Sequence, residues 1–388
     1  MRPTSRARRA KPESGPVDLR SDTVTQPTKQ MRAAMAAAEV GDDVLDRDPT
    51  MRALEERVAG LLGAADALWT PSGSMANLIA LMAHLERGDA FLAPAGSHVL
   101  EAELGTAAWL AGGMPQPLEH DGGPGKITPD AVRRAAGGPG AYYTMRTSLL
   151  CLENTHNAAG GTVTAPEEHA AVAAAARAAG LSVHLDGARL WHAAVALGVP
   201  PGALTVGADT VQVCLSKGLG APVGSLVAGS AEFTEEARRL RKMLGGGVRQ
   251  GGVLAAAGLV ALDRVDRLAE DHERARVLAE GLRERGWQVA DPETNIVLIG
   301  VADLAGTLAR FEESGVRVAP MGGKVRLMTH ADLTDDDIDT ALDRIGPVER
   351  EREAVPPHPA PTAPPTGPRS LRRTAGAAGR APARRAGR

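Results

Sequence analysis

The stretch Val211-Gln-Val-Cys-Leu-Ser-Lys217-Gly-Leu-Gly-Ala-Pro-Val-Gly224 decides the fold class of this chain. Apolar residues alternate at Val211, Val213 and Leu215, which predicts a strand. Lys217 follows the strand, and the glycines and proline after it are typical of a tight turn. The carboxyl end of a strand is where an α/β protein places ligands and reactive groups. Only six of the 44 basic residues are lysines. Because lysine can form a Schiff base at neutral pH and arginine cannot, Lys217 is predicted to be a reactive amine.

The composition predicts a soluble globular protein. The chain has 388 residues, 43% of them hydrophobic, and a net charge of -3, which allows one large α/β domain and a smaller one. Cys151 and Cys214 both lie in apolar runs, so we interpret them as buried thiols of a reducing cytoplasm and predict neither a disulfide nor a metal site. No apolar run reaches membrane-spanning length, and we expect a cytoplasmic protein without a membrane partner.

Both ends of the chain are basic. Residues 1–16 carry five basic groups and one acidic group, and residues 369–388 carry seven arginines and no acidic group. Such tails could bind nucleic acid. Short segments rich in arginine, alanine and proline are more often disordered ends without a partner of their own. We therefore expect disorder over 1–16 and 347–388, and no nucleic-acid partner.

Strand and helix patterns alternate through the first two thirds of the chain, which favours a mostly parallel sheet with helices on both faces. The expected segments are 28–38, 50–62, 67–70, 76–86, 90–93, 99–111, 115–118, 128–136, 148–152, 166–180, 181–185, 198–204 and 209–215. We predict that residues 17–252 form this large domain. A helical connection and a small C-terminal α/β domain are expected over 253–346.

A polar loop at 41–50 contains several carboxylates. It could bind Ca²⁺, but the ligand order and the glycine of an EF-hand are absent. We favour a loop whose Asp48-Pro49-Thr50 opens the helix 50–62, because Asp is a good N-cap and Pro fits the first helical position.

A carboxylate and an anion site complete the predicted chemistry. Asp186 ends the strand-like run 181–185, one crossover before Lys217. It could form an ordinary ion pair with Arg189, or it could hold the pyridinium nitrogen of a cofactor. Gly73 and Ser74 precede the helix 76–86, where free N–H groups and the helix dipole favour an anion. Together these groups favour pyridoxal phosphate.

Eight stretches, which follow one another along the chain, resemble the low-specificity L-threonine aldolase family, whose members are fold type I pyridoxal-phosphate enzymes. They span about residues 17–346 and are DLRSDTVTQPT (18–28), GDDV with DPT (41–50), PSGSMAN (71–77), ENTHN (153–157), HLDGARLWHA (184–193), CLSKGLGAPVGSL (214–226), RKMLGGGVRQGG (241–252) and VRLMTH (325–330). The resemblance implies an aspartate aminotransferase-like fold. It also implies retro-aldol cleavage of L-threonine or L-allo-threonine to glycine and an aldehyde, by a dimer or tetramer.

The resemblance assigns most of the cofactor contacts. It implies that Lys217 binds pyridoxal 5'-phosphate covalently, that Asp186 pairs with the pyridine nitrogen, and that Arg189 lies near the phenolic oxygen. Gly73 and Ser74 would bind the phosphate.

Further contacts implied by the resemblance come from a histidine and from a second subunit. His98 would stack on the pyridine ring. Lys242 and Arg249 would reach the phosphate of a neighbouring subunit. No metal is implied.

On the substrate side, the resemblance implies that Ser21 and Arg326 hold the carboxylate. His156 would lie near the β-hydroxyl, and both His98 and His156 are candidate general bases. Many relatives have Tyr-Gly where this chain has Leu45-Asp46, which bears on substrate preference. The alternatives are another reaction on the same fold (β-elimination, racemisation or transamination) and a non-catalytic binding protein.

Overall fold

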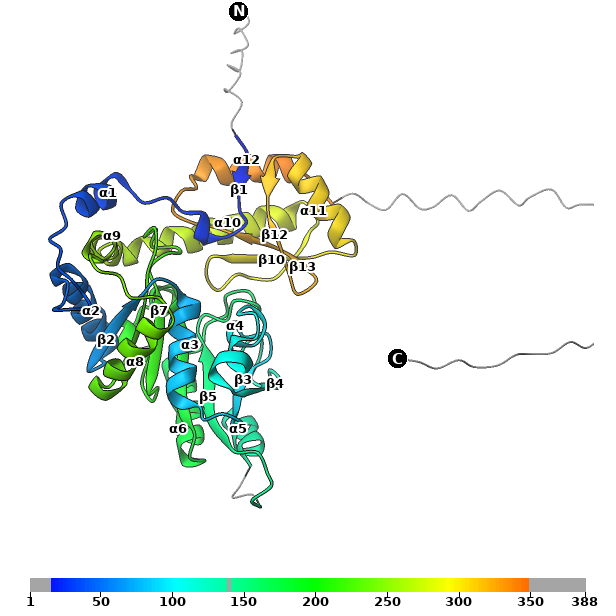
Figure 1. The fold of residues 1–388 in the computed structure, drawn as a ribbon. Helices are drawn as coiled ribbons and strands as arrows, with labels where there is room; N and C mark the ends of the chain where they lie inside the picture. The colour runs from blue at the N-terminus through cyan, green and yellow to red at the C-terminus, as the bar shows by residue number, and fades with distance from the viewer. Residues whose placement is uncertain (1–14, 138–140, 349–388) are drawn as a thin grey trace, which may run out of the picture. The chain divides into compact units, whose positions relative to one another are not determined.

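The structure, a computed structural model, describes residues 15–137 and 141–348 and contains a seven-stranded sheet (Figure 1). The predicted disordered ends fall almost entirely outside these residues. The strands run in the order β2-β8-β7-β6-β5-β3-β4. Their bounds are Asp66–Thr70 (β2), Ala90–Pro94 (β3), Met114–Leu118 (β4), Thr147–Glu153 (β5), Ser182–Gly187 (β6), Thr210–Cys214 (β7) and Ser225–Gly229 (β8).

Only β8 runs against its neighbours in this sheet. It pairs antiparallel with β2 and β7, whereas β7, β6, β5, β3 and β4 pair parallel in turn. The parallel strands therefore bring their carboxyl ends to one edge, which is where an open α/β sheet forms its ligand site.

Side-chain alternation along the strands divides the core between the two faces of the sheet. In β5, Leu150 and Leu152 pack in one cluster, while Leu149 and Cys151 pack in another. Because successive side chains of a strand point to opposite faces, each buried strand serves both clusters. This explains why the strands read as continuous apolar runs.

Helices cover both faces. α3 and α8 pack against each other on one face, and α2, α6, α7 and α9 contribute to the cluster on the other. The helices are Lys29–Ala36 (α1), Pro49–Leu62 (α2), Gly73–His84 (α3), His98–Glu101 (α4), Pro129–Ala136 (α5), Pro166–Ala178 (α6), Leu190–Leu197 (α7), Ala231–Met243 (α8), Gly252–Leu262 (α9), Leu268–Glu284 (α10), Leu304–Glu313 (α11) and Asp335–Ile345 (α12).

A second, smaller sheet has the order β12-β13-β10-β9 and is antiparallel throughout. Its strands are Gln288–Val289 (β9), Ile296–Gly300 (β10), Ala319–Met321 (β12) and Lys324–Met328 (β13). The N-terminal strand β1 (Val17–Asp18) pairs with β11 (Val316–Arg317), and Val17 and Leu19 pack in the core of this C-terminal part. The N-terminal residues 17–19 therefore belong to the C-terminal part of the structure and not to the large sheet.

Several local expectations need correction. The helix expected from 76 begins at Gly73, where the Ser72 side chain accepts a hydrogen bond from the Met75 N–H. α7 and β8 were not expected, whereas the helical connection expected from residue 253 is present as α9 and α10. Asp48 does cap α2, accepting from Met51 N–H at 2.9 Å. In the ranges that the structure describes, no helix is long and apolar enough to cross a bilayer.

Candidate active site

A cavity of about 310 Å³ lies at the carboxyl-end edge of the large sheet. Four residues predicted to hold the cofactor line it, namely Gly73, Ser74, Asp186 and Lys217, together with His98, which is expected to stack on the ring. They meet there because β6, β7 and the start of α3 converge at this edge. Its lining consists of Thr23, Pro71, Ser72, Gly73, Ser74, Asn77, His98, Asp186, Ala188, Gln212, Cys214, Ser216, Lys217, Pro222 and Val223.

Lys217 follows β7 in a tight turn that is fixed from two sides. The Lys217 carbonyl accepts from Thr25 Oγ1 at 2.9 Å and from Gly220 N–H at 2.8 Å. A Cβ atom at Gly218 would lie 2.6 Å from His192 Nε2, so only glycine fits beneath the lysine. Within the described part of the chain, the Lys217 amine has no hydrogen-bond or ion-pair partner, which leaves it free to react.

Asp186 sits at the end of β6, 2% exposed. Its carboxylate accepts from Asn77 Nδ2 at 2.7 Å and from Ala188 N–H at 3.0 Å. The possible ion pair between Asp186 and Arg189 is absent, because Arg189 is bonded elsewhere. Among the described residues, no lysine or arginine forms an ion pair with the Asp186 carboxylate, which lines the cavity.

Arg189 pairs with Asp22, which the sequence did not single out. Both residues are buried, and the Arg189 Nε and Nη2 atoms donate to Asp22 at 2.8 and 2.7 Å. Burial alone would raise the pKa of Asp22, but the guanidinium holds it well below its usual value. Arg189 does not line the cavity as it stands.

Asn157 links two guanidinium groups. Its Oδ1 atom accepts from Arg189 Nη1 at 3.2 Å and from Arg326 Nη1 at 3.3 Å. Burial, followed by the nearby Arg189, lowers the pKa of Arg326. Ser21, at the cap of a short 3₁₀ turn, precedes Asp22. Two cations that converge on one amide oxygen form an environment that favours an anion.

His98 lines the cavity and is held by two carboxylates. Its Nδ1 atom lies 2.8 Å from Glu103 Oε1, and its backbone N–H donates to Glu153 Oε2 at 2.7 Å. The hydrogen bond to Glu103 raises the pKa of His98 against the effect of burial. Burial and the Asp186 carboxylate raise the pKa of Glu153 to about 7.

His156 lies outside this cavity. It is 1% exposed, its Nε2 atom is 3.4 Å from Ser97 Oγ, and its ring packs edge-on against His120 with centroids 5.2 Å apart. Burial and His120 lower the pKa of His156 to about 4. The structure therefore brings only one of the two candidate bases to Lys217.

The residues at the start of α3 fit a phosphate-bearing ring. A Cβ atom at Gly73 would lie 2.8 Å from both Cys214 Sγ and Gln212 Nε2, so glycine lets the backbone approach β7. Gln212 is fully buried at the cavity wall, and its Oε1 atom has no partner among the described residues. A cavity with helix N–H groups at one end, a carboxylate in its wall and a free lysine amine fits pyridoxal phosphate.

Lys242 and Arg249 are exposed and do not line this cavity. Arg249 Nη1 lies 3.3 Å from Asp42 Oδ1, and its carbonyl accepts from Asp43 N–H. The carboxylates of Asp42, Asp43 and Asp48 in the loop 41–50 thus bond to groups of the protein itself. Leu45 in this loop is 76% exposed.

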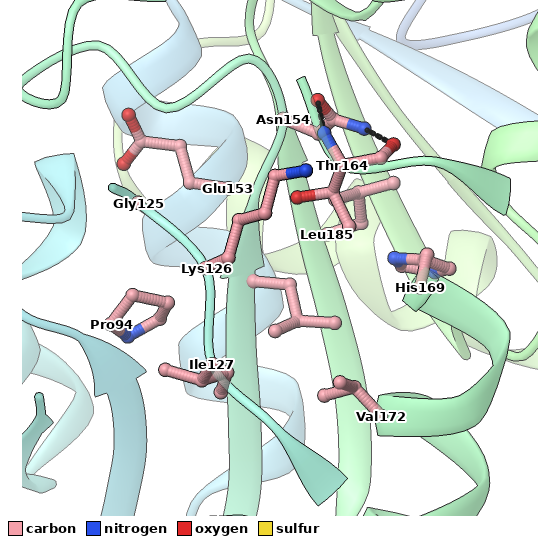
Figure 2. Close-up of a pocket in the computed structure, with 11 residues that line it drawn as sticks. Pro94, Gly125, Lys126, Ile127, Glu153, Asn154, Thr164, His169, Val172 and Leu185 are labelled. Atoms are coloured by element: carbon pink, nitrogen blue, oxygen red, sulfur yellow. Dashed lines mark hydrogen bonds between the residues drawn. The ribbon is translucent and has the colours of Figure 1, made fainter. Parts of the chain in front are cut away.

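A second, much smaller cavity of about 20 Å³ lies next to β5, lined by Lys126, Glu153, Asn154, Thr164 and His169 among others (Figure 2). Its two drawn hydrogen bonds join the Asn154 amide to the Thr164 backbone. A cavity of this size holds at most one water molecule, so the larger cavity is the candidate site.

Comparison with known proteins shows the family to which the chain belongs. The profile of the beta-eliminating lyase family matches residues 18–304. Low-specificity L-threonine aldolase 1 of Arabidopsis thaliana is 43% identical, over 84% of this chain and 94% of that protein. Low specificity L-threonine aldolase of Escherichia coli (strain K12) is 41% identical, over 83% of this chain and 96% of that protein.

Solved structures share the fold. A threonine aldolase of Leishmania major superposes with a TM-score of 0.73 at 19% identity, covering 85% of this chain and 98% of that one. Serine palmitoyltransferase of Sphingomonas wittichii gives 0.68 at 18%, covering 85% and 86%. This is the fold of type I pyridoxal-phosphate enzymes, and the predicted fold class and cofactor are confirmed. The chain belongs to the beta-eliminating lyase family, with the low-specificity L-threonine aldolases as its relatives.

Proposed function

We propose that this chain cleaves L-threonine, L-allo-threonine and related β-hydroxy-α-amino acids between Cα and Cβ, releasing glycine and an aldehyde. The observation that carries the proposal is the placement of Lys217 and Asp186 in one cavity, in a chain whose relatives are named threonine aldolases. The reaction would belong to threonine catabolism.

The residues proposed to hold the cofactor are those of the cavity wall. Lys217 supplies the covalent attachment, Asp186 faces the pyridine nitrogen, and Gly73 and Ser74 receive the phosphate. His98 packs on the ring. When bound, pyridoxal phosphate draws electrons away from the α-carbon of an attached amino acid, so that a bond at that carbon can break.

Arg326 and Ser21 are proposed to bind the substrate carboxylate. The carboxylate would replace Asn157 as the acceptor between Arg326 and Arg189, which explains why two guanidinium groups are held so close together. A bidentate contact also fixes the direction of the bonds at the α-carbon.

His98 is the better supported of the two candidate bases. His98 lines the cavity, and in the neutral form with Nδ1–H directed at Glu103 its ring carries the acceptor on Nε2. In this role His98 removes the proton of the β-hydroxyl group. His156 could act as the base only if its side chain moved, because its two ring nitrogens already bond to Ser97 Oγ and to the Ala159 N–H.

A homodimer or homotetramer is proposed because Lys242 and Arg249 lie near exposed apolar side chains. Leu45 and Met243 are 76% and 70% exposed. Burying them against a second subunit would also direct basic side chains towards its phosphate site.

Both free cysteines are buried, which fits a reducing cytoplasm.

The test is aldehyde release from L-threonine and L-allo-threonine by purified protein with added cofactor, coupled to an alcohol dehydrogenase. Glycine and aldehyde in equal amounts are expected. The family description makes β-elimination the alternative. Ammonia and a keto acid from L-serine, without aldehyde from L-threonine, would establish that reaction instead.

A further inference from the structure

Asn77 lies in α3 between three polar side chains. It is 2% exposed, in a part of the helix whose other buried residues are apolar. Its Nδ2 atom donates to Asp186 Oδ2 at 2.7 Å and to Glu103 Oε1 at 2.9 Å, and its Oδ1 atom accepts from His184 Nε2 at 3.1 Å. Both amide hydrogens and the carbonyl oxygen are thus used.

The orientation of the amide follows from these partners. A flipped Asn77 would direct its oxygen at two carboxylates. His184 fixes the same orientation, because its Nδ1 atom lies 2.9 Å from Thr210 Oγ1, whose hydroxyl can donate to it. Burial lowers the pKa of His184 to about 4, so the ring is neutral and its Nε2–H faces Asn77.

The hydrogen bonds form one directed chain. His84 Nε2 lies 3.0 Å from Thr210 Oγ1, so the donors run from His84 through Thr210 and His184 to Asn77. Such chains polarise each member and strengthen the last donor. The last donors here reach the two carboxylates.

Asp186 and Glu103 need a shared donor because they are close. Ligating atoms of His98, Glu103 and Asp186 lie within 4.8 Å of one another. Asn77 Nδ2 donates to one oxygen of each carboxylate, so a single amide group satisfies both acceptors and holds Asp186 and Glu103 in a fixed relation.

We propose that Asn77 is a positioning residue that joins Asp186 and the Glu103–His98 pair into one hydrogen-bonded unit, so that the ring-binding carboxylate and the general base keep a fixed relation. This inference rests on the proposed function for the role of His98. The bond from Asn77 to Asp186 concerns cofactor binding, so its effect can be measured whatever the substrate is.

The first experiment compares Asn77→Leu with wild type. Apoprotein is titrated with pyridoxal phosphate, and the dissociation constant is read from the visible band of bound cofactor. We expect at least a tenfold weaker affinity and a lower kcat for L-threonine. Asn154→Leu is the matched control, because Asn154 is equally buried and its side-chain amide, among the described residues, bonds only to the Thr164 backbone. The control should lower Tm without changing the dissociation constant more than about twofold.

A second pair of variants covers the case in which Asn77→Leu does not fold. The His184 ring nitrogens bond to Thr210 and Asn77 and to neither carboxylate, and His184 does not line the cavity. We expect His184→Leu to weaken cofactor binding several-fold and His184→Gln, which keeps a donor for Asn77, to restore it. Wild-type affinity in Asn77→Leu, or equal affinity in both His184 variants, would overturn the proposal. Absence of aldehyde from wild type would overturn the proposed function alone.

Discussion

Asp22 holds Arg189 through both of its carboxylate oxygens, 167 residues away in the sequence. Replacing Asp22 with alanine leaves a buried guanidinium without its counter-charge, so we expect the free energy of unfolding to fall by about 3–5 kcal/mol. Urea unfolding measures this. The exposed pair Glu273–Arg276 is the control, and Glu273→Ala should lower the free energy of unfolding far less, because solvent screens an exposed ion pair. Equal losses in the two variants would contradict the buried pair.

Glu153 should make the protein less stable as the pH rises. Its pKa is about 7 in the folded chain, against 4.5 as the ordinary value. Between these values the folded state binds more protons than the unfolded state, so the free energy of unfolding falls with increasing pH. We expect Glu153→Gln to reduce that fall by about 1–3 kcal/mol between pH 5 and pH 8. An unchanged pH dependence of unfolding would show that Glu153 is ionised throughout.

The two histidines should differ in kinetics. His98→Gln removes the proposed base, so kcat for L-threonine should fall by about 10²–10⁴-fold. His156→Gln should lower Tm, and it should lower kcat less than His98→Gln does, because His156 lies outside the cavity. Steady-state kinetics with melting curves measure both. A larger loss of kcat in His156→Gln would reverse the assignment.

Arg326 should act on substrate binding. Arg326→Lys keeps a positive charge but loses the planar fork, so kcat/KM for L-threonine should fall about 10–100-fold. The affinity for the cofactor should stay near that of wild type. A large loss of cofactor affinity with an unchanged KM would place Arg326 at the phosphate instead.

The sequence predicted the site correctly where a strand with clear apolar alternation ends at the functional residue. β6 and β7 end beside Asp186 and Lys217, and their alternation made the parallel sheet and these two residues predictable. α7 was missed because its residues are almost uniformly apolar and show no helical period. The burial of His156 was not predictable, since it depends on Ser97 and His120 from other segments.

Partners distant in the sequence explain the other omissions. Asn77 reads as one polar residue in an apolar helix, and only the fold brings it to Asp186 and Glu103. Asp22 was visible within a quoted motif, but nothing local indicated that Arg189 would prefer it to Asp186.

The central claim is that Lys217 carries the cofactor. Purified protein incubated with pyridoxal phosphate is reduced with sodium borohydride, digested, and analysed by mass spectrometry, with Lys217→Ala treated in parallel. The account predicts a reduced pyridoxyl group on the peptide that contains Lys217, and none in the variant. Label on a different lysine, or on none in a protein that still releases aldehyde from L-threonine, would contradict it.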